Sequence, residues 1–115
     1  MQVRPEHPGD HDSVRALNLA AFEPGEEAAI VDRLRAEADP TISLVAIHDE
    51  LVEGHIMFSP VTLGDHPKAV FMALGPMAVL PARQRSGIGA SLVSAGLEQC
   101  KALGVDGVIV LGHPT

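Results

Sequence analysis

The sequence predicts one mixed α/β domain with the element order strand, helix, helix, three strands, helix, strand. Two changes of pattern carry this prediction. Apolar residues recur at helical spacing before residue 40, and from Ile42 their period becomes that of β-strands. The almost uninterrupted apolar run of residues 69–80 then leads, through a loop with two glycines, into another helical pattern that starts at Ile88. This succession of strand, glycine loop and helix is the most informative part of the chain.

Proline positions and helical periodicity define the N-terminal elements. Gln2 to Arg4 form a predicted short strand that closes at Pro5. Pro8 at a first helical position and Asp10 in the first turn favour a helix start there. The first helix is marked by Val14, Leu17, Ala21 and Phe22 up to Pro24-Gly25, and a second one, which ends at Asp39-Pro40, by Ile30, Val31, Leu34 and Ala38.

Three strands are predicted between residues 42 and 80. Ile42–Ile47 and Leu51–Thr62 pair as a hairpin around a tight turn at His48-Asp49-Glu50, and a turn near Gly64 leads into Ala69–Leu80. Because apolar residues fill the last of these strands, we expect it to be the central strand, buried on both faces. Pro76 stands in its middle and cannot donate a ladder hydrogen bond, so we expect a bulge or a parting of strands there.

A helix and a strand complete the predicted order. The helix is expected to end at Gly104, because glycine readily adopts the left-handed conformation that stops a helix. Val105–Leu111 is the expected last strand. One face of the helix is predicted to consist of Ile88, Leu92, Ala95, Gly96, Cys100 and Leu103.

Composition restricts the class of protein. A chain of 115 residues with 46% apolar and 20% charged residues is typical of one soluble globular domain. Neither a membrane-spanning run nor a secretory leader is found, and the single cysteine, Cys100, suits a reducing cytoplasm as a small buried residue. The formal net charge of −7 argues against a nucleic-acid partner and slightly favours a cationic or amine-bearing one.

The segment from Val79 to Ala90 has the features of an anion-binding loop. Gly87 and Gly89 let the main chain approach a ligand closely. The first N–H groups of the following helix have no intrahelical acceptor and point at whatever lies in front of them. A pyrophosphate is the expected ligand.

Two common phosphate-binding loops do not fit this segment. A dinucleotide fingerprint requires a third glycine where Leu92 stands, and no acidic residue in a second βα unit follows. A Walker A loop requires a lysine directly after its second glycine, and none is present. A third possibility is a structural α/β domain whose loop binds no nucleotide.

The loop resembles motif A of the GNAT (Gcn5-related) N-acetyltransferases, which grip the pyrophosphate of acetyl-coenzyme A (acetyl-CoA). The matching residues are Gln84-x-x-Gly87-x-Gly89, after a strand that ends Met77-Ala78-Val79-x-Pro81. The resemblance extends from Val3 to Pro114 and indicates the YhbS-like branch of the superfamily. The further segments that carry it are Arg4-Pro5, Ala21-Phe22, Gly54-His55-Ile56, Phe58-Ser59-Pro60-Val61, Leu74-Gly75-Pro76 and Val110-Leu111-Gly112-His113-Pro114.

The resemblance implies a site for acetyl-CoA as co-substrate and an amine, on a small molecule or a protein, as acceptor. The sheet would splay at Pro76, and the pantetheine arm would pair with the backbone of Met77, Ala78 and Val79. Arg83 would be a neighbour of the phosphates. The loop and helix start would supply the remaining binding residues Gln84, Arg85, Ser86, Gly87, Ile88, Gly89 and Ala90.

The resemblance also implies that residues 1–115 form a single GNAT domain truncated after its fifth strand. GNAT domains continue with another helix and a closing pair of strands. We therefore expect the last strand to be an exposed edge with apolar surface beside it. A homodimer that covers this surface is the favoured expectation, and a marginal monomer is the alternative.

The catalytic groups stay unassigned. Backbone N–H groups at a bulge near Met77 are the expected oxyanion donors. Residues 69–80 hold no carboxylate, so Glu53 and His55 are the nearest candidate bases, each with an ordinary structural interpretation as a solvent-facing carboxylate or a packed histidine, and water or a remote group is the alternative. The family often uses a tyrosine as acid, but the chain contains none, so a leaving thiolate would take the amine proton directly.

No metal site is expected from the six histidines. Only His7 and His11 have helical ligand spacing, and no third ligand accompanies them. Two classes of function remain. One is an acetyl-CoA-dependent N-acetyltransferase acting on a primary amine, and the other is a non-catalytic acyl-CoA-binding or interaction module with the same fold.

Overall fold

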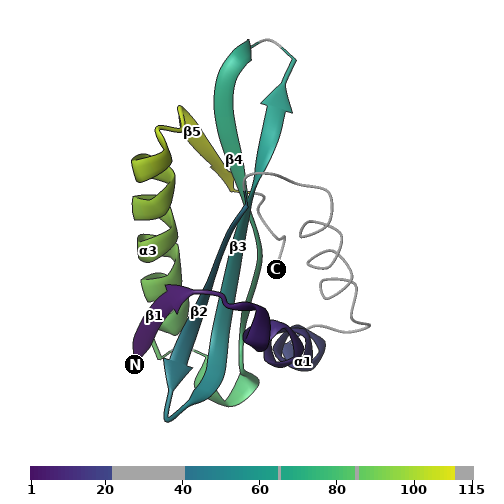
Figure 1. Cartoon of the computed structure of the whole chain (residues 1–115), viewed down its shortest axis with the longest axis vertical. Helices are drawn as coiled ribbons and strands as arrows, with labels where there is room; N and C mark the ends of the chain where they lie inside the picture. The colour runs from purple at the N-terminus through teal and green to yellow at the C-terminus, as the bar shows by residue number, and fades with distance from the viewer. Residues whose placement is uncertain (22–40, 65, 85, 111–115) are drawn as a thin grey trace.

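The computed structural model describes residues 1–21, 41–64, 66–84 and 86–110 (Figure 1). The predicted second helix, marked by Ile30 to Ala38, lies outside these residues. The strands are β1 (Gln2–Pro5), β2 (Ile42–His48), β3 (Leu51–Leu63), β4 (His66–Val79) and β5 (Gly107–Val110). The helices are α1 (His11–Ala21) and α3 (Ile88–Leu103), and short 3₁₀ turns lie at Pro8–Asp10 and Pro81–Arg83.

The described strands form one mixed sheet in the order β1-β2-β3-β4-β5. β1 to β4 are antiparallel neighbours, whereas β4 and β5 are parallel. Helix α3 lies against one face of the sheet and α1 against the other (Figure 1). The mixed α/β fold and the predicted order of the described elements are confirmed.

The alternation of side chains along the strands divides the core between the two faces. On the α3 face, Leu44, Ile56 and Phe58 pack with Leu92 and further residues of the larger hydrophobic cluster. On the α1 face, Val14 packs with Val45 and Met57 in a smaller cluster. Because residues i and i+2 of a strand share a face, one sheet can bury an apolar surface against each helix.

The β2–β3 hairpin has the tight turn that the sequence predicts. Asp49 and Glu50 both have positive φ, 51° and 66°, and His48 pairs with Leu51. The ladder is irregular directly beyond the turn. Ala46 pairs with Gly54 but Ile47 pairs with Val52, so Glu53 is the extra residue of a β-bulge in β3.

The bulge predicted at Pro76 is present in β4. Ile56 pairs with Met77 and Phe58 with Leu74, so Gly75 and Pro76 together lie opposite the single residue between Ile56 and Phe58. The extra residue reverses the alternation of side chains. The residues of β4 that pack against the α3 cluster therefore change from Met72 and Leu74 to Met77 and Val79.

Two expectations about β4 are wrong. The middle strand of the described sheet is β3, because β5 extends the order on one side of β4 and three strands lie on the other. β4 is also not buried on both faces along its length, since Val70 is half exposed and, among the β4 residues whose burial the structure describes, only Met72 and Ala78 are buried. Apolar content alone did not separate a central strand from its neighbour, because both are rich in apolar residues.

Helix α3 begins and ends as predicted, at Ile88 and with a left-handed Gly104 after Leu103. Its buried residues are Ile88, Leu92, Gly96 and Cys100. Leu103, which we expected on the buried face, is 54% exposed because it lies in the last turn, beyond the edge of the cluster. The following strand is shorter than predicted at its start, as β5 begins at Gly107 rather than Val105.

Candidate functional site

The start of α3 presents free backbone donors. Gly87 is the N-cap residue, with φ 86° and ψ 0°, and no side chain caps the helix. The first helical hydrogen bond runs from Ser91 N–H to the Gly87 carbonyl at 3.0 Å. The N–H groups of Ile88, Gly89 and Ala90 precede this bond, so they have no acceptor within the helix. Together with the positive end of the helix dipole, they favour an anion in front of Gly87.

The C-terminal end of β4 lies beside these donors. A Cβ atom at Gly89 would be 3.8 Å from Met77 Cε and 3.9 Å from Val79 Cγ2. Within the described residues, β4 pairs with β5 only from Phe71 to Leu74. The backbone of Met77 to Val79 therefore pairs with β3 on one side and, in the part of the chain that the structure describes, with no strand on the other.

The segment that connects β4 to α3 is held by several hydrogen bonds. Leu80 N–H donates to the Glu53 carbonyl at 2.9 Å, and Arg83 N–H donates to the Leu80 carbonyl at 2.8 Å. The Gln84 amide donates to the Val79 carbonyl at 3.3 Å, and the Ser86 hydroxyl donates to the Arg83 carbonyl. The loop thus reaches Gly87 in a defined conformation.

The predicted binding residues lie together around this loop, but they differ in how much of each residue is exposed. Gln84, Ser86, Gly87 and Ala90 are exposed, while Met77, Val79 and Gly89 are half-buried. Ala78 and Ile88 are 2% and 3% exposed, so only their backbone is available to a ligand at the surface. Arg85 lies outside the described residues.

Glu53 is not the solvent-facing carboxylate that we expected. It is 8% exposed, and its Oε2 lies 3.2 Å from Arg83 Nε, which makes an ion pair without hydrogen-bond geometry. His48 Nδ1 is 3.8 Å from the same oxygen. Strand alternation could not reveal this pair, because the bulge at Glu53 changes the direction of its side chain.

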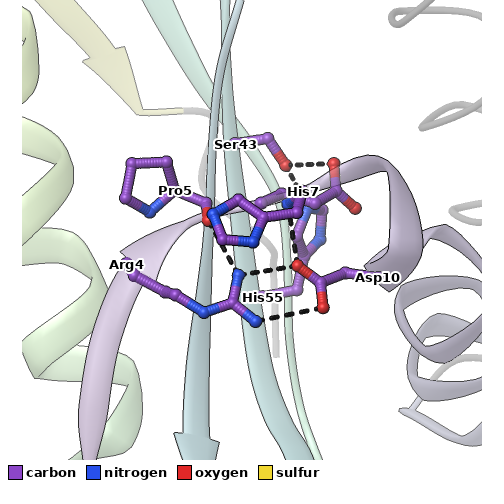
Figure 2. A network of polar contacts seen from close by, with 7 residues as sticks. Arg4, Pro5, His7, Asp10, Ser43 and His55 are labelled. Atoms are coloured by element: carbon purple, nitrogen blue, oxygen red, sulfur yellow. Dashed lines mark hydrogen bonds and ion pairs between the residues drawn. The ribbon is translucent and has the colours of Figure 1, made fainter.

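His55 is a packed histidine of the α1 face with no exposed surface. Its Nε2 lies 2.8 Å from Ser43 Oγ, and the Ser43 hydroxyl donates to Glu6 Oε1 at 2.9 Å (Figure 2). Because the hydroxyl hydrogen is committed to Glu6, Ser43 accepts from His55, which places a proton on Nε2. Nδ1 then faces the Asn18 amide nitrogen at 3.5 Å. This bonding gives His55 a structural role and no exposed nitrogen for a substrate.

A second polar cluster fixes the end of β1 to the turn before α1. Arg4 donates two hydrogen bonds to Asp10, at 2.7 and 3.1 Å, and a third to the Pro5 carbonyl (Figure 2). Asp10 also accepts from His7 N–H at 2.7 Å. The bonds from Arg4, with that from His7, lower the pKa of Asp10 to about 2. Asp10 is therefore a structural carboxylate that stays ionised.

The remaining candidates do not add a second site. Cys100 is buried as predicted, and burial raises the pKa of its thiol. Among the described residues, no three His, Cys, Asp or Glu side chains gather as a metal site, and no helix is long and apolar enough to cross a membrane. A cavity of about 520 Å³ lies where β1 ends and β2 begins, and Gln99 and Leu103 of α3 line it. It is about 13 Å or more along α3 from the free N–H groups, so it is separate from the loop.

Comparison with known proteins gives one family. Residues 11–114 match the Acetyltransferase (GNAT) family. The chain is 37% identical over 116 residues to the uncharacterized N-acetyltransferase YhbS of Escherichia coli K12, covering 99% of this chain and 68% of YhbS. It is 34% identical over 109 residues to the uncharacterized N-acetyltransferase YjhQ of the same strain, covering 92% of this chain and 60% of YjhQ.

A solved structure similar to this chain belongs to the same family. The crystal structure of a GNAT family acetyltransferase from Brucella melitensis in complex with acetyl-CoA superimposes with a TM-score of 0.88 at 42% identity. The match covers 98% of this chain and 76% of the Brucella protein. The chain thus spans less than two thirds of YjhQ and somewhat more of the other two. With a family match over most of its length and relatives above 30% identity, the chain belongs to the GNAT family of acetyltransferases.

Proposed function

We propose that this protein is an N-acetyltransferase that binds acetyl-CoA between β4 and the start of α3 and transfers its acetyl group to a primary amine. The observation that carries the proposal is the convergence of two sets of backbone groups. Within the described residues, the β4 backbone beyond Leu74 is free of β5, and the α3 N–H groups that have no acceptor within the helix lie beside it. The GNAT membership and the acetyl-CoA complex of the Brucella relative support the same ligand.

The two sets of groups suit different parts of the co-substrate. The N–H groups of Ile88, Gly89 and Ala90 would donate to the pyrophosphate, with Gln84 and Ser86 beside it. The backbone of Met77, Ala78 and Val79 would pair with the amide groups of the pantetheine arm as a neighbouring strand does. An N–H group at the Gly75–Pro76 bulge, near Met77, would stabilise the oxyanion of the tetrahedral intermediate.

The transfer step needs no protein nucleophile. The amine nitrogen attacks the thioester carbonyl carbon, the C–S bond then breaks, and the nitrogen proton passes to the departing thiolate. Glu53 is paired with Arg83 and His55 is bonded to Ser43, so neither serves as a general base in this proposal. Water is the expected first proton acceptor from the incoming ammonium group, which otherwise stays protonated at neutral pH.

We further propose that the protein is cytoplasmic and forms a homodimer. Its only cysteine is a buried free thiol, in line with a reducing compartment. Val70 and Val110 are 51% and 65% exposed on β4 and β5, and β5 is the last strand of the described sheet. An open strand edge beside exposed apolar residues favours pairing with a second copy.

Substitution of Gly89 tests the binding site. Gly87 is a poor choice, because its φ of 86° makes any other residue strained. A Cβ atom at Gly89 makes only ordinary contacts, so Gly89→Glu can fold. A carboxylate in the first helical turn favours the helix, but it repels a pyrophosphate. We expect the melting temperature of the free protein to be unchanged or raised, and acetyl-CoA affinity in calorimetry to fall at least tenfold.

Ser94→Glu is the matched control, since Ser94 is an exposed residue of α3 beyond the first turn. It should leave acetyl-CoA affinity unchanged. If the wild-type protein binds no acetyl-CoA, or if Gly89→Glu binds it equally well, the proposed site is wrong. If acetyl-CoA binds but no free thiol is released with a panel of primary amines, the protein is a non-catalytic acyl-CoA-binding module instead.

A further inference from the structure

We propose that Glu53 is a positioning residue for acetyl-CoA, because it fixes the guanidinium group of Arg83 beside the phosphate-binding loop. This inference rests on the proposed function, and it assigns a role to two residues outside the glycine loop itself. Neither residue touches the free N–H groups of α3 through a contact in the structure. Their role would be to define where one cation lies when the phosphates arrive.

The backbone of β3 places Glu53 for this role. As the extra residue of the bulge between the pairs Ala46–Gly54 and Ile47–Val52, Glu53 has no cross-strand partner in β2. Bulges redirect a side chain and are common beside functional sites. Here the carboxylate is buried, 8% exposed, and reaches Arg83 rather than solvent.

Glu53 holds the connecting segment at two points. Its carbonyl accepts from Leu80 N–H at 2.9 Å, and its carboxylate lies 3.2 Å from Arg83 Nε. Between these points lies the 3₁₀ turn Pro81–Arg83, which Arg83 N–H closes by donating to the Leu80 carbonyl. One residue of β3 therefore fixes both the start of the turn and the side chain at its end.

The ion pair leaves most of the Arg83 guanidinium available. Nε is buried against Glu53, yet the side chain as a whole is 41% exposed. Within the described part of the chain, neither Nη group of Arg83 makes a hydrogen bond. Arginine binds phosphate oxygens through such paired N–H groups. A guanidinium held by its Nε loses less conformational entropy when a phosphate binds than a free one does.

The net negative charge of the protein makes a fixed cation beside the phosphate-binding loop favourable for binding. The chain has a net charge of −7, which disfavours approach of the phosphate groups of acetyl-CoA. Arg83 lies one residue before Gln84 at the beginning of the glycine loop, where a fixed positive charge offsets this repulsion locally. His48, 3.8 Å from Glu53 Oε2, adds a second cation to the cluster only when it is protonated.

Two substitutions of Glu53 test the positioning role. Glu53→Ala removes the acceptor for Arg83 Nε, whereas Glu53→Gln keeps a side-chain oxygen in its place. We expect Glu53→Ala and Arg83→Ala each to weaken acetyl-CoA binding in calorimetry about tenfold, and the double variant to be no weaker than either alone. Glu53→Gln should keep most of the wild-type affinity for acetyl-CoA. Glu98→Ala, which removes an exposed carboxylate of α3, should have no effect.

Other roles of Glu53 give other results. If its charge merely repels phosphate, both Glu53→Ala and Glu53→Gln will bind acetyl-CoA more tightly than the wild type. If Glu53 only stabilises the fold, the losses of acetyl-CoA affinity in Glu53→Ala and Arg83→Ala will add in the double variant. Each loss will then be proportional to the decrease in the melting temperature of that variant. Either result overturns the positioning role. Absence of acetyl-CoA binding by the wild-type protein would instead reject the proposed function.

Discussion

At the scale of single residues, Asp10 both marks the start of a helix in the sequence and makes an ion pair in the structure. Aspartate two residues after Pro8 is a helix-start signal, and the structure adds a bidentate interaction with Arg4. The pKa of Asp10, about 2, lies below the ordinary 3.8. The carboxylate therefore stabilises the folded state above about pH 4, and this contribution is lost as the pH falls from 4 to 2.

Asp10→Asn is expected to reduce stability at pH 7 by about 1 kcal/mol, because the interaction is partly screened by solvent. At pH 2 the variant and the wild type should differ much less, since protonation has already weakened the wild-type interaction. Urea denaturation at several pH values between 2 and 7 measures this difference. Asp12→Asn, a substitution of an exposed carboxylate in the first turn of α1, is the control. An Asp10→Asn deficit that does not change with pH would contradict the assigned ion pair.

The histidine and the carboxylate considered as candidate bases show the limit of residue-level prediction. The sequence placed Glu53 and His55 near the site by strand position, and it offered a packed histidine as the ordinary interpretation of His55. The structure agrees for His55, which bonds to Ser43. It differs for Glu53, because the partner Arg83 is 30 positions away in the sequence and no local pattern joins the two.

At the scale of elements, the packing of α3 on β3 depends on Gly96. A Cβ atom at this position would lie 2.1 Å from Phe58 Cε1, so the helix approaches the sheet closely over the phenylalanine ring. Helix propensity alone favours alanine over glycine by about 1 kcal/mol. Burial of Phe58, which has no exposed surface, leaves the ring no room to move away.

We therefore expect Gly96→Ala to destabilise the protein by about 1–3 kcal/mol, despite the gain in helix propensity. Thermal and urea denaturation measure the change. Ser94→Ala, at an exposed position of the same helix, should be neutral or slightly stabilising. The double variant Gly96→Ala, Phe58→Leu should lose less than the sum of its single changes, because the smaller side chain makes room. A stabilised Gly96→Ala variant would show that the helix lies farther from the sheet.

The bulges at Pro76 and Glu53 differ in how well the sequence predicts them. The bulge at Pro76 is predictable, because proline has no N–H group and cannot donate a hydrogen bond to the neighbouring strand. Glu53 carries no such signal, since any residue type can be the extra residue of a bulge. The boundaries of β2, β3 and α3 agree with prediction to within one residue at each end, because turns and glycines mark them locally.

At the scale of the whole molecule, stability is expected to fall from the middle of the sheet to its edges. β3 pairs with β2 from Leu51 to Phe58 and with β4 from Gly54 to Leu63, and residues 53–59 are all buried. β1 and β5 have four residues each and lie at the two ends of the described sheet. Amides exchange with solvent through local opening, which costs least where few buried contacts are lost.

Native-state hydrogen exchange should therefore show the slowest amides in residues 53–59 of β3 and much faster exchange in β1 and β5. Mass spectrometry of deuterated peptides resolves these segments. Binding of acetyl-CoA should additionally slow the amides of residues 86–90 at the start of α3. Equal protection of β3 and β5 would mean that partner association closes the β5 edge of the sheet.

By itself, the sequence determined the type and order of the described elements, the bulge at Pro76 and the glycine loop before α3. These depend on local periodicity, on the missing N–H of proline and on the freedom of glycine, all of which are properties of short segments. The tertiary structure decided that β3 rather than β4 is the middle strand of the described sheet, that Glu53 pairs with Arg83 and that His55 bonds to Ser43. Those features arise from pairing register and from contacts between distant segments, and a register shift of one residue reverses which face a side chain occupies.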